Sequence, residues 1–386
     1  MERTVELGKL ITQAKTVRCG NASYPVLSMT MHNGLVFQGE KFKKVIASKD
    51  TSDYKVVYRN QLVISFPIDE GVLATQRITD AGIVSPAYGI WDIDQTQILP
   101  EYLECALRCN RAIQYYKAKL RGSTARRRSL PTPTLLAFRV PLPSIEKQHE
   151  ILSQIHRVRS IIRNREEQIS KLDDLIKARF VEMFGDPKVN EKHWDEGVIA
   201  DYFEVKGGKR IPKGMDYAEG KTDHPYLRAT DMKNETILDD DIHYIDDDVY
   251  QHIKRYTVQG GDIYLTNVGV NLGMAGVIPE KYSGANLTEN AVKLVPKTDK
   301  FRGIFIANYI NSPGIQEYIK ERKMTVGVPK LAIFRIETML LIIPPIEKQD
   351  EFAVFRAQVD KSKVVVQKAL NEAQLLFDSL MQQYFG

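Results

Sequence analysis

The residues best suited to chemistry on a polyanion lie at 120–130, where the sequence reads LRGSTARRRSL. Ser and Thr hydroxyls bond phosphate oxygens, and arginine guanidinium groups neutralise phosphates or enter a DNA groove. Residues 101–140 hold nine Lys or Arg against two Glu, whereas the whole chain has a net charge of only +5. Such a local basic patch indicates a polyanion partner. A solvated helix face beside a charged loop is the alternative explanation.

Three other segments are candidates for the same role: KERKMTVGVPKL (320–331), VKGGKRIPKG (205–214) and TNVGVNLGMAG (266–276). The asparagines of 266–276 are of the type that reads adenine edges. The alternatives are a plain surface turn at 205–214 and a tight β-connection at 266–276. The predicted DNA-contacting residues are Arg121, Ser123, Thr124, Arg126, Arg127, Arg128, Lys206, Lys209, Arg210, Asn267, Asn271, Lys323, Thr325 and Lys330.

Catalytic and metal chemistry are not indicated. The glycines at 207–208 lack the spacing of a phosphate-binding P-loop, and the acidic run at 239–248 has no second ligand set, as expected of a solvated loop. Cys105 and Cys109 are one helical turn apart with no histidine nearby, so buried helix cysteines are expected rather than a metal site. SPAY (85–88) lacks the second proline of the adenine methyltransferase motif. We therefore predict no metal, no cofactor on this chain and no catalytic residue.

An internal repeat organises the chain. PSIEKQ at 143–148 recurs as PPIEKQ at 344–349, and each copy runs on without insertion to MFG (183–185) or YFG (384–386). Proline suits the first turn of a helix, acidic residues favour its N-terminal end, and glycine favours its C-terminal end. Each copy is therefore predicted to be one long helix.

Both predicted helices carry a heptad stripe of apolar residues. The stripes most simply pack on each other as an antiparallel coiled coil, although a seam of this kind could also serve a homodimer. The principal seam residues are Ile155, Val158, Ile162, Ile169, Leu172, Ile176, Val359, Val366, Leu370, Phe377 and Leu380.

The parts before the helices contain short β-type runs and helix-like segments, so the fold class is α+β. YPVLSMT (24–30) resembles PYLRATD (225–231), which extends the repeat. The predicted domains are two mixed α/β heads and two spacer helices in a pseudo-two-fold repeat, with bounds at 1–142, 143–185, 186–343 and 344–386.

Three features resemble the specificity subunit of a type I restriction-modification system. They are the sequences at the two helix starts, the segment LDDLIKARFVEMFGDP (172–187) and the domain-length repeat. YPVLSMTMHNGLVFQGEKFKK (24–44) is similar to a target-recognition domain of that family. The resemblance implies a non-enzymatic subunit that binds double-stranded DNA, with each head reading one half of a split target.

The resemblance also implies partners that carry the chemistry. These are two methyltransferase subunits, which hold S-adenosylmethionine and methylate adenine N6, and restriction subunits that use ATP and Mg²⁺. The sequence shows neither an apolar signal core nor a stretch of about 18 apolar residues, so we expect a cytoplasmic protein without a membrane partner. A coiled-coil scaffold without a DNA role and a self-contained DNA methyltransferase remain as alternatives; the missing motifs disfavour the latter.

Overall fold

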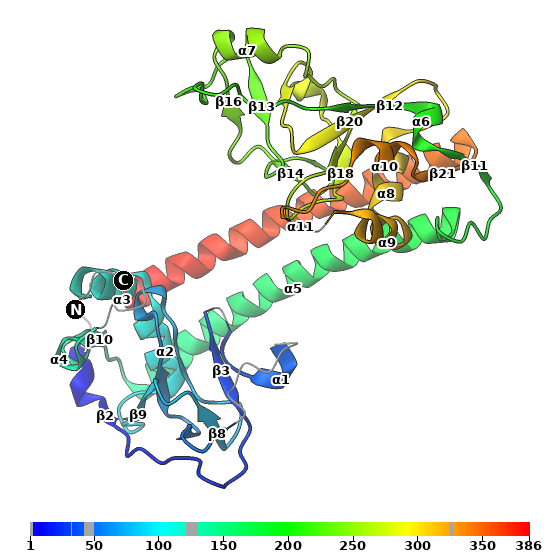
Figure 1. Ribbon diagram of the computed structural model, residues 1–386. Coiled ribbons are helices and arrows are strands. Elements are labelled where there is room, and N and C mark those ends of the chain that lie inside the picture. Colours follow the sequence, from blue (N-terminus) through cyan, green and yellow to red (C-terminus); the bar gives the residue numbers. More distant parts are fainter. Residues whose placement is uncertain (1–2, 32, 42–49, 121–129, 325–326) are drawn as a thin grey trace. The chain divides into compact units, whose positions relative to one another are not determined.

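The computed structural model describes residues 3–31, 33–41, 50–120, 130–324 and 327–386. The chain forms two compact units: unit 1 comprises Met1–Glu166 and Gln367–Gly386, and unit 2 comprises Glu167–Val366. Figure 1 shows two long helices, α5 and α11, which span Ile145–Phe184 and Ile346–Phe385. Each unit therefore contains one α+β head together with part of both long helices.

The head of unit 1 is built on a four-stranded antiparallel sheet in the order β2-β9-β6-β7. Three two-stranded pairs, β1–β10, β3–β4 and β5–β8, surround it. The strands are β1 Thr4–Glu6, β2 Ile11–Gln13, β3 Leu27–Thr30, β4 Gly34–Phe37, β5 Lys55–Tyr58, β6 Leu62–Ile64, β7 Leu73–Thr75, β8 Ala81–Val84, β9 Gly89–Ile93 and β10 Arg139–Pro141.

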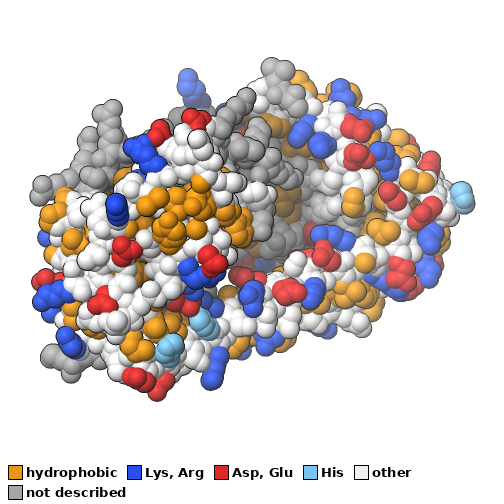
Figure 2. Space-filling view, turned by 90° about the horizontal axis from the view of Figure 1, so that it is seen from below, with side chains coloured by type: hydrophobic (Ala, Val, Ile, Leu, Met, Phe, Trp, Pro, Cys, Tyr) orange, Lys and Arg blue, Asp and Glu red, His pale blue; other side chains and the backbone are white. Residues whose placement is uncertain are grey.

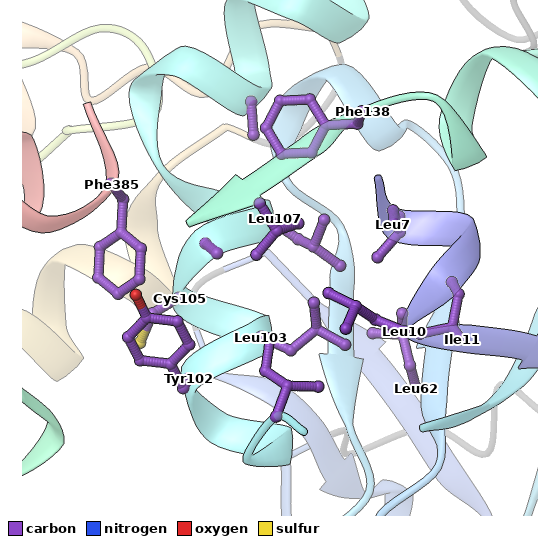
Figure 3. Close-up of a cluster of buried hydrophobic side chains, with 14 of the residues drawn as sticks. Leu7, Leu10, Ile11, Leu62, Tyr102, Leu103, Cys105, Leu107, Phe138 and Phe385 are labelled. Carbon is purple, nitrogen blue, oxygen red and sulfur yellow. The ribbon is translucent and has the colours of Figure 1, made fainter. Parts of the chain in front are cut away.

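Helices pack on this sheet and close the core of unit 1. Figure 3 shows Tyr102, Leu103 and Leu107 pointing into a cluster that also holds Phe385 from the end of α11. Tyr102 and Phe385 lie with ring centroids 5.0 Å apart. The helices are α1 Gln38–Lys41, α2 Pro100–Arg108, α3 Asn110–Lys119 and α4 Thr132–Leu136, with 3-10 turns at Leu7–Lys9 and Ile68–Glu70.

The head of unit 2 has the equivalent sheet in the order β12-β20-β17-β18, with a three-stranded sheet β16-β13-β19 and the pairs β11–β21 and β14–β15. The strands are β11 Asp195–Val198, β12 Phe203–Gly207, β13 Pro225–Leu227, β14 Met232–Lys233, β15 Thr236–Ile237, β16 His243–Tyr244, β17 Ile263–Thr266, β18 Ala275–Val277, β19 Asn286–Leu287, β20 Ala291–Pro296 and β21 Leu340–Ile343. The helices are α6 Ile199–Tyr202, α7 Asp247–Ile253, α8 Gly303–Asn311, α9 Pro313–Arg322 and α10 Ile333–Glu337, with a 3-10 turn at Glu280–Tyr282.

The two heads share one order of elements. In unit 1 the sheet is followed by α2, α3, α4 and β10 before α5 begins, and in unit 2 it is followed by α8, α9, α10 and β21 before α11 begins. β10 pairs antiparallel with β1, and β21 pairs antiparallel with β11. The sequence repeat is thus a repeat of the whole head and not only of the helix.

The glutamine of each EKQ phrase explains why the phrase is repeated. Gln148 is fully buried; its Oε1 accepts from the Leu99 backbone N at 2.8 Å, and its Nε2 donates to the carbonyls of Gln97 and Pro143, both at 3.0 Å. A primary amide offers an acceptor oxygen and two donor hydrogens, and all three atoms are used here. It ties the start of α5 to the start of α2.

Gln349 repeats this arrangement in unit 2. It is fully buried, accepts from the Arg302 backbone N at 2.9 Å, and donates to the carbonyls of Lys300 and Pro344, both at 2.9 Å. The start of α11 is thereby tied to the start of α8. Each glutamine fixes a long helix to its own head.

The long helices pair antiparallel within each unit. In unit 1 the early α5 residues Ile151 and Ile155 share a core with Phe385 near the end of α11. In unit 2 the late α5 residue Phe180 lies against the early α11 residue Phe352, with ring centroids 5.4 Å apart. The heptad stripe is used within one chain.

The residues of the predicted seam are buried or half-buried. Buried are Ile155, Val158, Ile176 and Val359, and half-buried are Ile162, Ile169, Leu172, Val366, Leu370, Phe377 and Leu380. Charges that interrupt the stripe are paired: Lys363 with Asp173, and Arg179 with Glu351 at 2.8 Å. Within the described residues, no helix is long and apolar enough to cross a membrane.

Candidate nucleic-acid interface

The four-stranded sheet of unit 2 brings the predicted DNA loops to one of its ends. In the antiparallel register Gly207 pairs with Val292, and Thr266 pairs with Ala291. β12 and β17 therefore end where β20 begins. The segments that follow Gly207 and Thr266 leave the sheet at the same edge.

The segments 267–274 and 327–331, which we call the paired loops, are bonded to each other. The Gly269 N donates to the Pro329 carbonyl at 2.9 Å, and the Leu331 N donates to the Asn267 carbonyl at 2.8 Å. Two predicted DNA segments distant in sequence thus form one local structure. The paired loops include Lys330, which is exposed. The Lys330 carbonyl accepts from the Met324 N at 2.8 Å, and half-buried Lys323 directly precedes Met324.

Asn267 holds the paired loops together. Its side chain is only 5% exposed, and its Nδ2 donates to the Leu331 carbonyl at 3.3 Å. Its Oδ1 is buried without a hydrogen-bond partner. The prediction that Asn267 reads an adenine edge does not fit this placement, because the amide points into the protein. Asn271 is half-buried, and its carbonyl accepts from the Thr266 hydroxyl at 2.5 Å.

The basic turn after β12 is held close to the sheet by Gly208. A Cβ at Gly208 would lie 2.0 Å from the Thr288 carbonyl oxygen, so only glycine fits there. The Gly208 N donates to the Ala291 carbonyl at 3.1 Å, and the Lys209 N donates to the Leu287 carbonyl at 2.8 Å. The turn therefore presents Lys209 and Arg210, both exposed, from a fixed backbone.

Two of the basic side chains carry acidic partners. Arg210 pairs with Glu289 at 2.7 Å, with the Arg210 side chain 78% exposed, and Lys206 pairs with Glu204 at 2.7 Å. Partial burial pushes the pKa of Glu289 upward, but the hydrogen bonds from Arg210, its own backbone and Thr288 outweigh burial and hold that pKa below its usual value. Glu289 therefore stays ionised and pairs with Arg210 at the end of the sheet.

Asn290 was not singled out by the sequence. Its carbonyl accepts from the backbone N of Asn267 and of Val268, at 3.0 and 3.3 Å. It joins the paired loops to the start of β20. A single asparagine before a strand carries no signal of such a role.

Some carboxylates of the acidic run at 239–248 form local ion pairs. Asp239 pairs with Lys281 and Tyr282, and Asp241 lies 3.0 Å from an Arg228 nitrogen. Hydrogen bonds from Lys281 and, to a smaller extent, Tyr282 lower the pKa of the Asp239 carboxyl group. The hydrogen bond from Arg228 lowers the pKa of the Asp241 carboxyl group. No group of three or more His, Cys, Asp or Glu side chains that could hold a metal occurs among the described residues.

The equivalent region of unit 1 is described only in part. Arg121, Ser123, Thr124, Arg126, Arg127 and Arg128 lie outside the described residues, as does Thr325 of unit 2. The preceding helix α3 carries exposed Lys117 and Lys119. On the face that Figure 2 shows, described Lys and Arg side chains are interspersed with Asp and Glu side chains.

The geometry of both heads agrees with comparisons to known proteins. Residues 191–373 match the family model of the type I restriction modification DNA specificity domain. The fold is similar along 100% of this chain to 96% of the S subunit of a type I restriction-modification system from M. genitalium, with a TM-score of 0.54 and 14% identity.

A second solved structure, which concerns the complex assembly and conformational transition of the type I R-M system, contains a chain with a TM-score of 0.57 and 16% identity; the match covers 99% of this chain and 97% of that chain. No curated protein matches the sequence. The resemblance seen in the sequence is confirmed: residues 191–373 match the model of the type I restriction modification DNA specificity domain, and the fold of the whole chain is similar to that of S subunits. A specificity domain is a recognition module and not a catalytic one.

Proposed function

We propose that this chain is the DNA-recognition subunit of a type I restriction-modification complex and that it reads a bipartite target in double-stranded DNA. The single observation that carries the proposal is the duplicated head: one sheet topology, one glutamine tie to a long helix, and different loop sequences at the sheet edge. Two heads with a common frame and unlike loops suit a target made of two unlike half-sites at a fixed spacing.

The chemistry would reside on partners. We propose that two methyltransferase subunits dock on the chain and supply S-adenosylmethionine, and that restriction subunits, where present, supply ATP and Mg²⁺ chemistry. The chain itself would position these partners on DNA in the cytoplasm. The target adenine would be extruded into the methyltransferase pocket, since its N6 cannot be reached within the duplex.

The first experiment is to co-express the chain with the neighbouring methyltransferase gene and to map N6-methyladenine across the host genome. A two-part motif with a fixed gap, methylated on opposite strands, is the expected result. No methylation in cells where the methyltransferase is soluble and bound would favour the coiled-coil scaffold. Methyl transfer by the purified chain alone would favour the self-contained methyltransferase.

A further inference from the structure

The turn between β14 and β15 has a glutamate where glycine is favoured. Lys233 pairs with Thr236, so Asn234 and Glu235 alone form the turn, and their φ values are 53° and 61°. A two-residue hairpin turn with both φ values positive favours asparagine followed by glycine. A larger residue persists in such a conformation where its surroundings hold it there. The contacts of Glu235 are therefore informative.

The Glu235 carboxylate is held by Arg356 of the long helix α11. Arg356 is only 6% exposed, and its Nη1 donates to Glu235 and, at 3.2 Å, to Asn308 Oδ1 of α8. Its Nε donates to Asp360 at 2.9 Å. A hydrogen-bonded ion pair has a fixed geometry, and in a buried site the loss of one partner leaves an uncompensated charge. The pair therefore fastens the β14–β15 hairpin to α11.

Glu235 also contacts the strand that follows one of the paired loops. Its carbonyl accepts from the Val277 N of β18 at 3.0 Å. A Cβ at Gly276 would lie 2.3 Å from the Glu235 carbonyl carbon, so only glycine allows this close approach. β18 directly follows the paired-loop segment 267–274. A continuous set of contacts thus runs from Arg356 through Glu235 to the paired loops.

Apolar packing beside this pair is incomplete. Close packing ordinarily holds neighbouring elements at one angle. Here a cavity of about 340 Å³ lies between the head and the long helices of unit 2. Its lining includes Asn234, Glu235 and Met274 of the head and Asp173, Arg356 and Lys363 of the long helices. The ion pair at the edge of this cavity therefore has an important part in fixing the angle.

Arg356 is the second polar attachment of this head to α11. Gln349, the first, lies seven residues earlier, which is about 10 Å along the helix. A single attachment permits rotation about it, and a second one opposes that rotation. In unit 1 the counterpart of Arg356 is the buried Ile155, and the β3–β4 hairpin is bonded to its own head, where Arg108 of α2 donates to the Met31 carbonyl at 2.6 Å. Unit 2 thus has a polar contact where unit 1 has an apolar residue.

We propose that Arg356 and Glu235 are positioning residues for DNA recognition, which fix the angle of the paired loops relative to α11 and so restrict the gap that the complex accepts between half-sites. The inference rests on the proposed function and deepens it. Adjacent base pairs differ by about 3.4 Å in rise and about 35° in rotation. A gap that is one base pair too long or too short therefore moves a half-site away from a head held at one angle.

The test uses the whole complex with its methyltransferase. Initial methylation rates are measured on duplexes that carry the mapped target with its native gap or with a gap one base pair longer or shorter. Arg356→Ile combined with Glu235→Gly removes both charges of the pair, and it places the unit 1 residue in the helix and the favoured residue in the turn. We expect the ratio of the rates on native and altered gaps to fall by about tenfold, an effect within the range of coupling energies in one contact network.

Two other variants make the result specific. Arg179→Leu combined with Glu351→Gln removes an ion pair between α5 and α11 and should keep the wild-type ratio. Glu235→Gln keeps an acceptor for Arg356 but removes the charge, and it should lower the ratio by about threefold. This milder variant provides the test if the double variant at Arg356 and Glu235 does not fold, which urea unfolding would show.

The outcomes separate the inference from the proposed function. If the wild-type complex yields no bipartite motif, both fail. If it yields a motif but Glu235→Gln and the folded double variant keep the wild-type ratio, the inference alone is overturned. An equal loss of methylation at every gap also overturns it, because the pair would then affect activity without fixing the angle of the head.

Discussion

Units 1 and 2 differ least where they hold a long helix and most where their sheets end in loops. Gln148 and Gln349 make the same three hydrogen bonds to equivalent atoms. The described loops 65–72 and 267–274 each contain a glycine with positive φ, Gly71 and Gly273, and otherwise differ in sequence. A duplicated protein can vary the surface that meets its target freely, because the frame depends on few buried interactions.

The long helices end as similarly as they begin. Phe184 and Phe385 are both fully buried, and their carbonyls accept from side chains: Trp194 Nε1 at 3.0 Å and Arg111 Nε at 2.8 Å. Helix C-termini leave carbonyls without intrahelical partners. Each unit provides a hydrogen-bond donor to one of these carbonyls, but the donor residue differs between the two units.

One departure from this equivalence is the buried Arg356, whose counterpart in α5 is Ile155. Arg356 is buried in unit 2, where it bonds Glu235, Asp360 and Asn308. Replacing Arg356 with isoleucine should destabilise the protein by about 3 kcal/mol, because Glu235 loses its main partner in a half-buried site. Urea unfolding would measure this decrease in stability.

Adding Glu235→Gln to Arg356→Ile should recover much of the stability, since the orphaned charge is removed. If the double variant is as unstable as the single one, packing of the arginine stem and not charge pairing is the cause.

The glutamine ties allow the two units to be compared directly. Gln148→Leu and Gln349→Leu should each cost about 2–3 kcal/mol, because each leaves one backbone N–H and two carbonyls without their partner in a buried site. Urea unfolding would measure the loss of stability. Hydrogen exchange should show lost protection of backbone amides at the start of α5 in Gln148→Leu and at the start of α11 in Gln349→Leu. The exposed Gln383→Leu is the matched control. A large effect in one unit only would contradict the equivalence of the ties.

DNA binding would distinguish the two heads by their loops. DNA binding should weaken when alanine replaces Arg126, Arg127 and Arg128, and also when alanine replaces Lys209 and Arg210. The slope of log K against log salt should become shallower by about one for each phosphate that the variant no longer neutralises. Measuring the affinity of each variant for DNA at salt concentrations between about 50 and 200 mM checks this change in slope. Unchanged binding would remove the altered loop from the interface.

The smallest effect concerns pH and distinguishes unit 1. Partial burial raises the pKa of Glu101, but hydrogen bonds and charge from His156 and Arg77 outweigh it and lower that pKa. A carboxyl group whose pKa is lower in the folded state than in the unfolded state stabilises the fold at pH values above its unfolded-state pKa, which is about 4.3 for glutamate. This stabilisation is lost as the pH falls through the folded-state pKa.

Glu101→Gln should therefore lower stability by at most about 1 kcal/mol at pH 7, because the pair is partly open to solvent. The difference from wild type should shrink below pH 4. A difference that is constant between pH 7 and pH 3 would exclude the ion pairs as its source.

Local sequence was sufficient to predict the repeat, the two long helices and their apolar stripe. Proline, acidic and glycine residues act locally at helix ends, and a heptad period is visible without knowledge of the partner. The helices begin at Ile145 and Ile346, within the predicted segments 143–185 and 344–386. The basic loops were also visible, since charge and glycine content are local properties.

Only the folded chain shows which of these segments meet. The bonds between 267–274 and 327–331 join backbone atoms that are far apart in the sequence, and backbone atoms are the same in nearly every residue type. Asn267 looked like a base reader because its amide suits adenine, yet burial turned the amide inward to Leu331. The compact units also cut across the long helices, since contacts between residues and not their order in the chain define a unit.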